Sequence, residues 1–332
     1  MRIVVLGGTR FIGPAVVRQL SQAGHEVMVF HRGDTEADSI ADVVHLHGDR
    51  QNLAAYAGHF ARHVPDVVLD MLPMSERDAR AVMTTFTGIA RRVVALSSMD
   101  VYRAYGRLHR TEPGPADPVP YREEGPLRER LYPYGDDYDK IPVERVVMGD
   151  PSLPGTVLRL PVVYGPGDYQ HRLFYYLKRM DDQRPAILLD EGIARWRWTR
   201  GYVENVAAAI ALAVTDARAS GKVYNVGETH PLTELKWVRA IGQAAGWTGT
   251  VVVVPRDHLP LALRWWGDAD TEHDLVTDTS RIRTELGYTE SVSPGEALQH
   301  TMAWERAHPP VDFPPDLLDY AAEDAVLATV RT

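Results

Sequence analysis

The sequence predicts an α/β protein with a doubly wound parallel sheet and a smaller C-terminal α/β domain. Short apolar runs alternate with helical patterns through the first half of the chain, which indicates right-handed βαβ units. Several of these runs are apolar at nearly every position, as in strands that are covered on both faces. The first run also ends in a glycine-rich turn that opens a helix, which is typical of Rossmann-type domains.

The elements follow from these patterns in order. Strands are expected over residues 2–7, 26–33, 43–49, 65–72, 91–98, 156–168, 221–227 and 251–255. Helices are expected over 14–24, 76–90, 203–214, 232–246, 278–288 and 293–308, with a peripheral amphipathic segment after the Pro-rich stretch 308–315. Residues 102–135 are rich in Pro, Gly, Arg and Glu without a period, so we expect a long loop there.

Composition excludes several classes of function. The net charge of −9 argues against nucleic acid as a partner, because such binding relies on many Lys and Arg facing phosphates. The chain has no Cys, so disulfides and thiolate chemistry are excluded. No apolar run long enough to span a bilayer and no leader pattern is visible, so a cytoplasmic protein without a membrane partner is expected.

A tight glycine turn follows the first strand, in the stretch VVLGGTRFIG. A dinucleotide pyrophosphate needs a sharp turn, close backbone approach and a helix N-terminus directed at the phosphates. Gly7, Gly8 and Gly13 supply the first two, and the helix that begins near Pro14 supplies the third. Arg10 stands where a middle glycine is expected, so its guanidinium is positioned to fold over a phosphate.

The motifs GGTRFIG, HGD, LSSMDVY, YDKIPVE, RLPVVYGPGD, YVENVAAAI and VYNVG occur in this order along nearly the whole chain. They resemble the extended short-chain dehydrogenase/reductase superfamily of NAD(P)-dependent epimerases and dehydratases, in an atypical branch that includes chloroplast stem-loop RNA-binding proteins. The resemblance implies an NAD(P)-binding Rossmann domain over 1–160. Residues 161–332 would be mainly a substrate-binding domain, with some segments returning to the first. It further implies a homodimer, and hydride-transfer chemistry on a sugar or nucleotide-sugar-like substrate: oxidoreduction, epimerisation or dehydration.

The predicted cofactor is NADP, with NAD as the second choice. Relatives that prefer NAD place an acidic residue at the end of the second strand, where this chain has His31 and Arg32. An Arg binds a 2′-phosphate bidentately, whereas a carboxylate repels it. By the resemblance, the residues on the cofactor are Gly7, Gly8, Thr9, Arg10, Phe11, Ile12, Gly13, His31, Arg32, Asp49, Arg50, Met71, Leu72 and Lys140.

The catalytic dyad of the superfamily does not align fully. Its members place a Tyr four residues before a Lys on one helix, with a Ser nearby, so that the cation stabilises the phenolate. Ser98 and Lys140 match the Ser and Lys positions, but Asp136 stands where the Tyr is expected. Tyr138 is the first candidate for the proton-transfer residue, and Tyr134 and Asp136 are the alternatives.

The geometry of this segment depends on Pro142. A proline is tolerated in the first turn of a helix and is costly in its interior, so the helix should begin between Asp137 and Lys140. Tyr138 would then precede the helix. On a regular helix two residues that are two apart do not share a face, so Tyr138 and Lys140 can only meet if this segment is not helical.

A basic, Trp-containing stretch marks the expected substrate side. Arg195, Arg197 and Arg200 alternate with tryptophans and suit an anion clamp, as in relatives that hold a nucleotide diphosphate. The register differs from the family's, because Trp198 occupies the usual Arg position and Asn205 replaces the usual Asp. The alternative is a solvated Arg face with packed tryptophans.

Two further interpretations complete the sequence analysis. His45 and His47 share one face of a strand but have no further ligand in the pattern, so we expect solvent-facing side chains and no metal site. Because the dyad is degenerate, a non-catalytic NADP-binding regulatory protein stays an alternative function. RNA binding of the chloroplast type is a second alternative, against which the acidic net charge argues.

Overall fold

The computed structural model describes residues 1–35, 40, 42–130, 137–264 and 266–330. Its main element is a seven-stranded, all-parallel sheet with the order β10-β6-β5-β4-β1-β2-β3, which confirms the predicted doubly wound architecture. The strands are β1 (Arg2–Leu6), β2 (Glu26–His31), β3 (Val44–His47), β4 (Val67–Asp70), β5 (Arg92–Ser98), β6 (Gly155–Leu160) and β10 (Val223–Asn225).

Helices cover both faces of this sheet, which explains the continuous apolar runs. Ile3 and Val5 of β1 pack toward one face, and Val4 and Leu6 pack toward the other. The first face carries α1 (Ile12–Gln22), α8 (Val203–Thr215) and α10 (Ser280–Leu286), and the second carries η2 (Arg50–Tyr56), α2 (Ala57–His63), α3 (Glu76–Phe86) and α5 (Lys140–Met148).

Local signals set the ends of these helices. After α1, Gly24 adopts a φ of 81°, the left-handed conformation that favours glycine. Ser75 and Asp78 form a reciprocal capping box at the start of α3. Asp139 caps α5 through the amide of Ile141, so the helix begins at Lys140, at the end of the expected interval, and Tyr138 precedes it.

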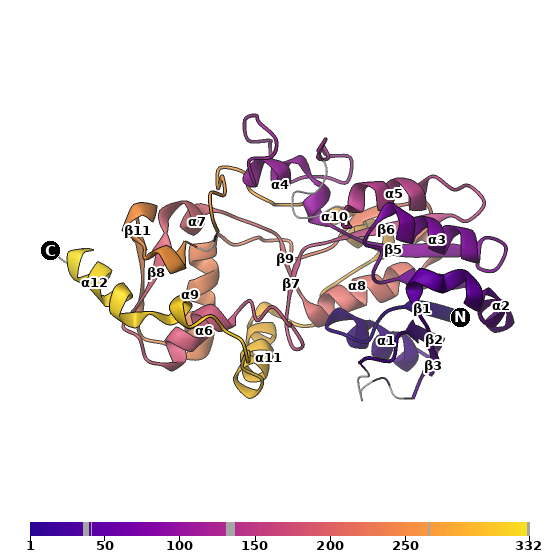
Figure 1. The fold of residues 1–332 in the computed structure, drawn as a ribbon, viewed down its shortest axis with the longest axis horizontal. Helices are drawn as coiled ribbons and strands as arrows, with labels where there is room; N and C mark the ends of the chain where they lie inside the picture. Colours follow the sequence, from indigo (N-terminus) through magenta and orange to yellow (C-terminus); the bar gives the residue numbers. More distant parts are fainter. Residues whose placement is uncertain (36–39, 41, 131–136, 265, 331–332) are drawn as a thin grey trace.

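A smaller unit lies beside the sheet and contains the C-terminus (Figure 1). It holds the two-stranded parallel sheet of β8 (Ala186–Asp190) and β11 (Thr250–Val254). The strands β7 (Val162–Tyr164) and β9 (Arg200–Tyr202) pair between the two parts. Its helices are α6 (Phe174–Asp181), α7 (Glu191–Arg195), α9 (Glu234–Ala245), α11 (Pro294–Ala307) and α12 (Tyr320–Val330), and the remaining short helices of the chain are η3 (Met99–Val101), η4 (Ala217–Ala219), η5 (Arg256–His258), η6 (Leu261–Leu263) and η7 (Pro315–Leu318).

One hydrophobic cluster extends across both parts. It joins Val5 and Leu20 on the α1 face of the large sheet to Ile187 and Trp237 of the smaller unit. At the far end of the smaller unit, Arg179 and Glu323 form a fully buried ion pair that fastens α12 to α6. This terminal helix was expected as a peripheral amphipathic segment, and the buried pair ties it to the rest of the unit.

Two expectations about the elements were wrong. The strand expected over 156–168 is interrupted at Pro161, which has no amide hydrogen to continue the ladder, so β6 stays in the large sheet and β7 pairs elsewhere. The segment 102–135 is not only loop, because α4 (Arg103–Leu108) forms within it and Tyr102 and Tyr121 make isolated bridges. None of the helices in the described ranges is long and apolar enough to cross a bilayer.

Candidate functional site

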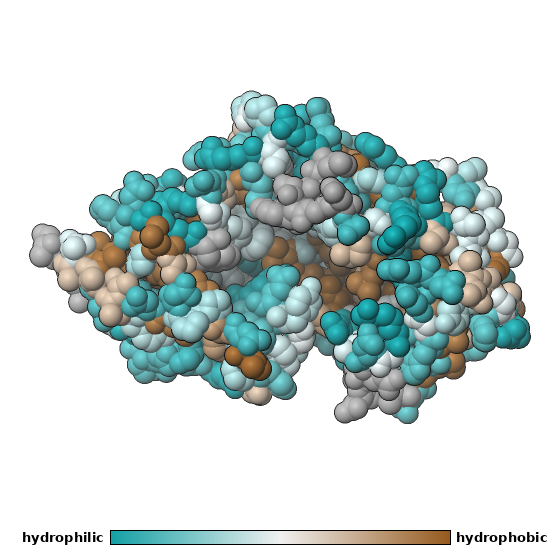
Figure 2. All heavy atoms as spheres, in the orientation of Figure 1, coloured by the Kyte–Doolittle hydropathy of each residue, from teal (hydrophilic) through white to brown (hydrophobic). Residues whose placement is uncertain are grey.

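A cleft of about 1300 Å³ opens beyond the carboxyl ends of the large sheet. Figure 2 shows this region as a hollow between the two parts, with hydrophobic atoms at its bottom. Ligands of open α/β sheets bind at this edge. Fifteen of the candidate residues named above line it: Gly7, Gly8, Thr9, Arg10, Phe11, Ile12, His31, Arg32, Asp49, Arg50, Met71, Leu72, Ser98, Tyr138 and Lys140.

The glycine turn has the backbone that a bound dinucleotide requires. Gly7 and Gly8 adopt φ values of 88° and 92°, which a side chain would strain. Gly13 does not line the cleft, and its role is packing: a Cβ there would lie 2.4 Å from the Cα of Gly8. Helix α1 can therefore approach β1 closely, and its N-terminus faces the cleft. These residues fit a pyrophosphate.

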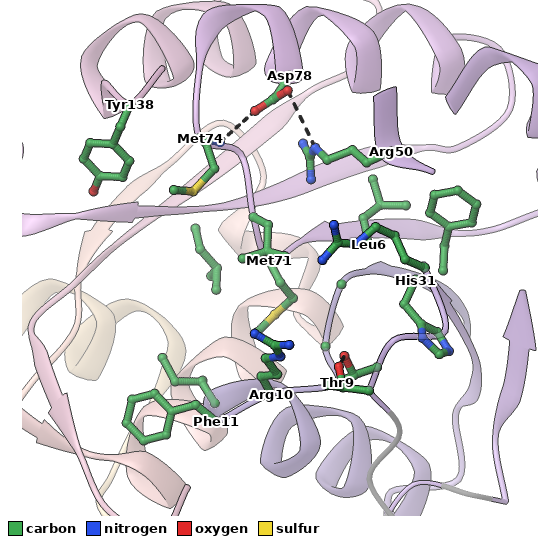
Figure 3. Close-up of a pocket in the computed structure, with 18 of the residues that line it drawn as sticks. Leu6, Thr9, Arg10, Phe11, His31, Arg50, Met71, Met74, Asp78 and Tyr138 are labelled. Carbon is green, nitrogen blue, oxygen red and sulfur yellow. Dashed lines mark hydrogen bonds and ion pairs between the residues drawn. The ribbon is translucent and has the colours of Figure 1, made fainter. Parts of the chain in front are cut away.

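Arg10 and Phe11 project from this turn into the cleft (Figure 3). Arg10 is exposed and extends beside Met71, so its guanidinium is available to a phosphate oxygen. Phe11 adopts a φ of 47° and packs edge-on against Tyr169, with 6.3 Å between ring centres. Tyr169 was not singled out by itself from the sequence, although the stretch that contains it was expected at the rim of the cleft.

At the end of the cleft where the adenosine is expected, two arginines pair with carboxylates that the sequence analysis did not single out, Asp34 and Asp70. Arg32 pairs with Asp34 at 3.1 Å, and both side chains are largely exposed. Arg50 lines the cleft while it forms a bidentate pair with the buried Asp70, at 2.6 Å for each bond. Asp49 caps η2 by accepting from the amide of Gln51. Asp70 ends an apolar strand, but the sequence around it does not reveal that Arg50 is its partner.

The histidines correct another expectation. His45 is half-buried rather than solvent-facing, because its Nδ1 lies 2.8 Å from Nε2 of His31 and its Nε2 lies 3.0 Å from the carbonyl oxygen of Ile40. His47 is exposed, and its ring packs edge-on against His31 with 4.7 Å between centres. The sequence pattern on β3 did not reveal that His31 of β2 completes a group of three.

Lys140 reaches the cleft from the first turn of α5. It is 6% exposed, and its Nζ donates to the carbonyl oxygen of Pro73 at 2.7 Å. Burial lowers the pKa of Lys140 to about 8, while the nearby carboxylates of Asp100, Asp70 and Asp78 act in the opposite direction. The ammonium has three donors, so two stay available for hydroxyl groups in the cleft after the bond to Pro73.

Tyr138 also lines the cleft, in the non-helical segment before α5. Its ring centre lies 5.2 Å from Nζ of Lys140, so the two residues meet as the late helix start allows. Its hydroxyl donates to Oδ2 of Asp100 at 2.7 Å. Asp100 is buried, and desolvation raises the pKa of its carboxyl group. The alternatives Tyr134 and Asp136 lie outside the described residues.

Ser98 ends β5 beside these residues. Its Oγ accepts from the amide of Asp100 at 3.2 Å, and it therefore caps the following short helix. That bond uses a lone pair and leaves the hydroxyl hydrogen for a ligand. Asp100 lies in the same motif as Ser98, LSSMDVY. Its hydrogen bond from Tyr138 was not predicted, because the two residues are 38 apart in sequence.

The basic stretch on the substrate side does not form the expected anion clamp. Arg197 pairs with Asp274, with Nη2 to Oδ2 at 2.7 Å, and Arg200 pairs with the buried Glu234. Neither residue lines the cleft. Trp198 belongs to a tryptophan cluster with two other indole rings. Arg172 lines the cleft instead, but Asp168 already binds it at 2.5 Å.

Comparison with known proteins identifies the family of this fold and site. The model of the NAD dependent epimerase/dehydratase family matches residues 3–227. The chain is 28% identical over 306 residues to 2′-dehydrokanamycin reductase of Streptomyces kanamyceticus, covering 89% of this chain and 79% of that protein. It is 23% identical to the chloroplast stem-loop binding protein of 41 kDa b of Arabidopsis thaliana, covering 76% of this chain and 65% of that protein.

Solved structures match the fold over nearly the whole chain. UDP-glucose 4-epimerase of Thermotoga maritima, solved with UDP-glucose, superposes with a TM-score of 0.71 at 19% identity and covers 92% of this chain and 99% of its own. dTDP-glucose 4,6-dehydratase of Bacillus anthracis, solved with NAD, superposes with a TM-score of 0.71 at 18% identity, covering 93% and 97%. The glycine turn, the cleft and the match over residues 3–227 place this chain in the NAD dependent epimerase/dehydratase family.

Proposed function

We propose that this protein is an NADP-dependent oxidoreductase that reduces a carbonyl group on a sugar-like substrate with NADPH. It would also catalyse the reverse reaction, in which the alcohol is oxidised and NADP⁺ accepts the hydride. The observation that carries the proposal is that Ser98, Tyr138 and Lys140 line the same cleft as the glycine turn. The similarity to a reductase that is named for a dehydrokanamycin, an oxidised aminoglycoside, supports a carbonyl on a sugar ring.

NADP fits the residues at the edge of the cleft, and it would supply the hydride. The glycine turn and the N-terminus of α1 would hold the pyrophosphate, and Arg10 would fold over a phosphate. Arg32 would bind the 2′-phosphate, for which it must leave Asp34. An exposed ion pair contributes only about 0–1 kcal/mol, so this exchange costs little. Asp49, Met71 and Leu72 would line the adenosine and the path to the nicotinamide.

Lys140 would hold the ribose hydroxyls with the two donors that Pro73 does not use. At pH 7 the group is mainly an ammonium, because its pKa is about 8. Its charge would also favour loss of the phenol proton of Tyr138, whose ring centre is 5.2 Å away. The Ser98 hydroxyl would orient the substrate oxygen.

Tyr138 would give its proton to the carbonyl oxygen of the substrate as the carbon is reduced. The Tyr138 hydroxyl donates this proton to Asp100, so the phenol has to rotate toward the substrate. Tyr138 lies in the segment before α5, and rotation about its side-chain bonds would bring the hydroxyl to the substrate. Asp100 would hold the phenol in its resting position between turnovers.

The test is oxidation of NADPH, followed by absorbance, with a panel of keto-sugars, keto-aminoglycosides and nucleotide sugars. Tyr138→Phe should lower kcat by about 10²- to 10⁴-fold while NADPH affinity stays near wild type, because a general acid acts only in the chemical step. Tyr56→Phe, which alters a tyrosine outside the cleft, is the matched control. Full activity of Tyr138→Phe would move the role to Tyr134 or Asp136.

Binding of NADPH without turnover of any carbonyl would instead indicate a cofactor-binding regulatory protein. RNA binding has less support, because the chain carries a net charge of −9 and its likeness to the chloroplast protein is 23% identity.

A further inference from the structure

Three histidines converge at the edge of the large sheet, beside the glycine turn. His45 and His47 point to one face of β3 because strand side chains alternate, and the parallel register sets His31 of β2 opposite His47. One nitrogen from each ring lies within 4.8 Å of the others. The His31 ring lies next to Thr9 in Figure 3.

Hydrogen bonds orient two of these rings and fix their protonation. Nε2 of His45 lies 3.0 Å from the carbonyl oxygen of Ile40, so this nitrogen must carry the hydrogen. Nδ1 of His45 therefore presents a lone pair to Nε2 of His31, 2.8 Å away. A histidine that binds a metal typically donates its other N–H to a carbonyl in the same way, which fixes the ring and its tautomer.

We propose that His31, His45 and His47 bind one divalent transition-metal ion, and that Zn²⁺ is its natural occupant. Three imidazole nitrogens are a ligand set that suits Zn²⁺, with water in the fourth position, at Zn–N distances of about 2.0–2.1 Å. Three nitrogens within 4.8 Å of one another would reach those distances if the rings turned toward a common point. Cu²⁺ and Ni²⁺ accept the same ligands and would compete.

Binding rearranges one hydrogen. In the metal-free form Nε2 of His31 donates to Nδ1 of His45, and Nδ1 of His31 accepts from the amide of Gly33 at 3.2 Å. When the ion takes the lone pair of each facing nitrogen, the His31 hydrogen moves to its Nδ1 and the Gly33 amide turns away. The His31 ring stays neutral, so metal binding releases no net proton when the three imidazoles are already neutral.

The ion would fasten the edge strand β3 to β2. β3 is a four-residue edge strand that pairs on one side only, so the ion would add a second link between it and the sheet. His31 lines the cleft, and the ion would therefore lie at its rim without being part of the proposed hydride transfer. This inference does not depend on the identity of the substrate, and its test uses the metal ion alone.

The experiment titrates ZnCl₂ into untagged, full-length, chelator-treated protein by calorimetry, and follows Co²⁺ binding by its visible absorption. We expect one ion per chain, a tetrahedral Co²⁺ spectrum and a higher Tm with Zn²⁺, because the ion binds the folded chain. His47→Gln and His45→Gln should each weaken Zn²⁺ binding by at least about tenfold, since loss of an outer hydrogen-bond partner alone costs that much.

The control is His59→Gln, which alters an exposed histidine on the nearby helix α2 and should leave Zn²⁺ affinity unchanged. His45→Gln also removes hydrogen bonds, so its fold is checked by circular dichroism. His47→Gln removes an exposed ring and keeps the test decisive if His45→Gln unfolds. Absence of binding, or equal weakening in the His59→Gln and His47→Gln variants, would overturn the proposal.

Discussion

The proposed NADP preference predicts a competition for Arg32 between Asp34 and the 2′-phosphate, and Asp34→Asn is the change that tests it. In the free protein Arg32 is bound to Asp34 at 3.1 Å, and the two side chains are 69% and 58% exposed. At that exposure the pair contributes about 0–1 kcal/mol. A charge-assisted bond from Arg32 to a 2′-phosphate contributes about 1.5–3 kcal/mol, so the phosphate should displace Asp34.

The net gain from Arg32 is therefore about 0.5–3 kcal/mol, or roughly twofold to 150-fold in affinity. Arg32→Ala should lose this factor for NADPH and leave NADH nearly unchanged, since NADH has no 2′-phosphate. Asp34→Asn should increase NADPH affinity by up to about fivefold, because Arg32 no longer has to leave an ion pair. The increase should be larger at low salt than at high salt. Both affinities are measured by fluorescence titration without any substrate.

The ion pair of Arg80 and Glu76 on α3 is a matched control, because its side chains are 66% and 50% exposed and it lies outside the main cleft. Arg80→Ala should change neither affinity. The reasoning is refuted if Asp34→Asn weakens NADPH, if Arg32→Ala weakens both cofactors equally, or if the wild-type protein binds NADH more tightly than NADPH.

Three further outcomes follow from buried groups. The lowered pKa of Lys140, about 8, means that the unfolded chain binds more protons between pH 8 and the ordinary lysine value. The wild-type protein should therefore gain unfolding free energy relative to Lys140→Met as pH rises from 7 to 10 in urea titrations, and a constant difference would contradict the assignment. Arg159→Met leaves the buried carboxylate of Glu144 without its bidentate partner and should cost about 3–5 kcal/mol in the same assay, whereas a cost below 1 kcal/mol would mean that the pair is not buried as described. Gly13→Ala places a Cβ 2.4 Å from the backbone of the glycine turn and should abolish NADPH binding, while Gly58→Ala in α2, where only the tip of a flexible arginine is near, should leave it intact.

The fold was predictable because its signals are local. Apolar runs marked the strands of the large sheet, Gly24 marked the end of α1, and Pro142 marked the late start of α5. The same locality explains the two errors. Pro161 was visible inside an expected strand, but only pairing in space decides where the second half goes. Helix α4 has no apolar period of its own and forms where Tyr102 anchors its start to the core.

The site was predictable to the same extent. The positions of the glycine turn and of Lys140 in the cleft could be predicted, because each follows from the spacing of a motif within one segment. The partners of these residues come from distant segments: Asp100 holds Tyr138 across 38 residues, and Asp70 holds Arg50 across 20. Such pairs depend on strand order and register, which no single stretch of sequence contains. Asp34 is the exception, since it lies two residues after Arg32 and was available to sequence reasoning.

The hydrophobic cluster that joins both parts limits how this chain can recombine with its relatives. Val5 and Leu20 from the part with the large sheet pack in one core with Ile187 and Trp237 from the smaller unit. A chimera that joins this chain to a relative near residue 160 would bring together core side chains from two different proteins. Their volumes would not match, and protein interiors tolerate little mismatch in volume. We therefore expect that the smaller unit cannot be exchanged alone between relatives. We expect substrate specificity to change through substitutions in segments at the rim of the cleft, such as the turn that carries Tyr169. The shared core would stay unchanged.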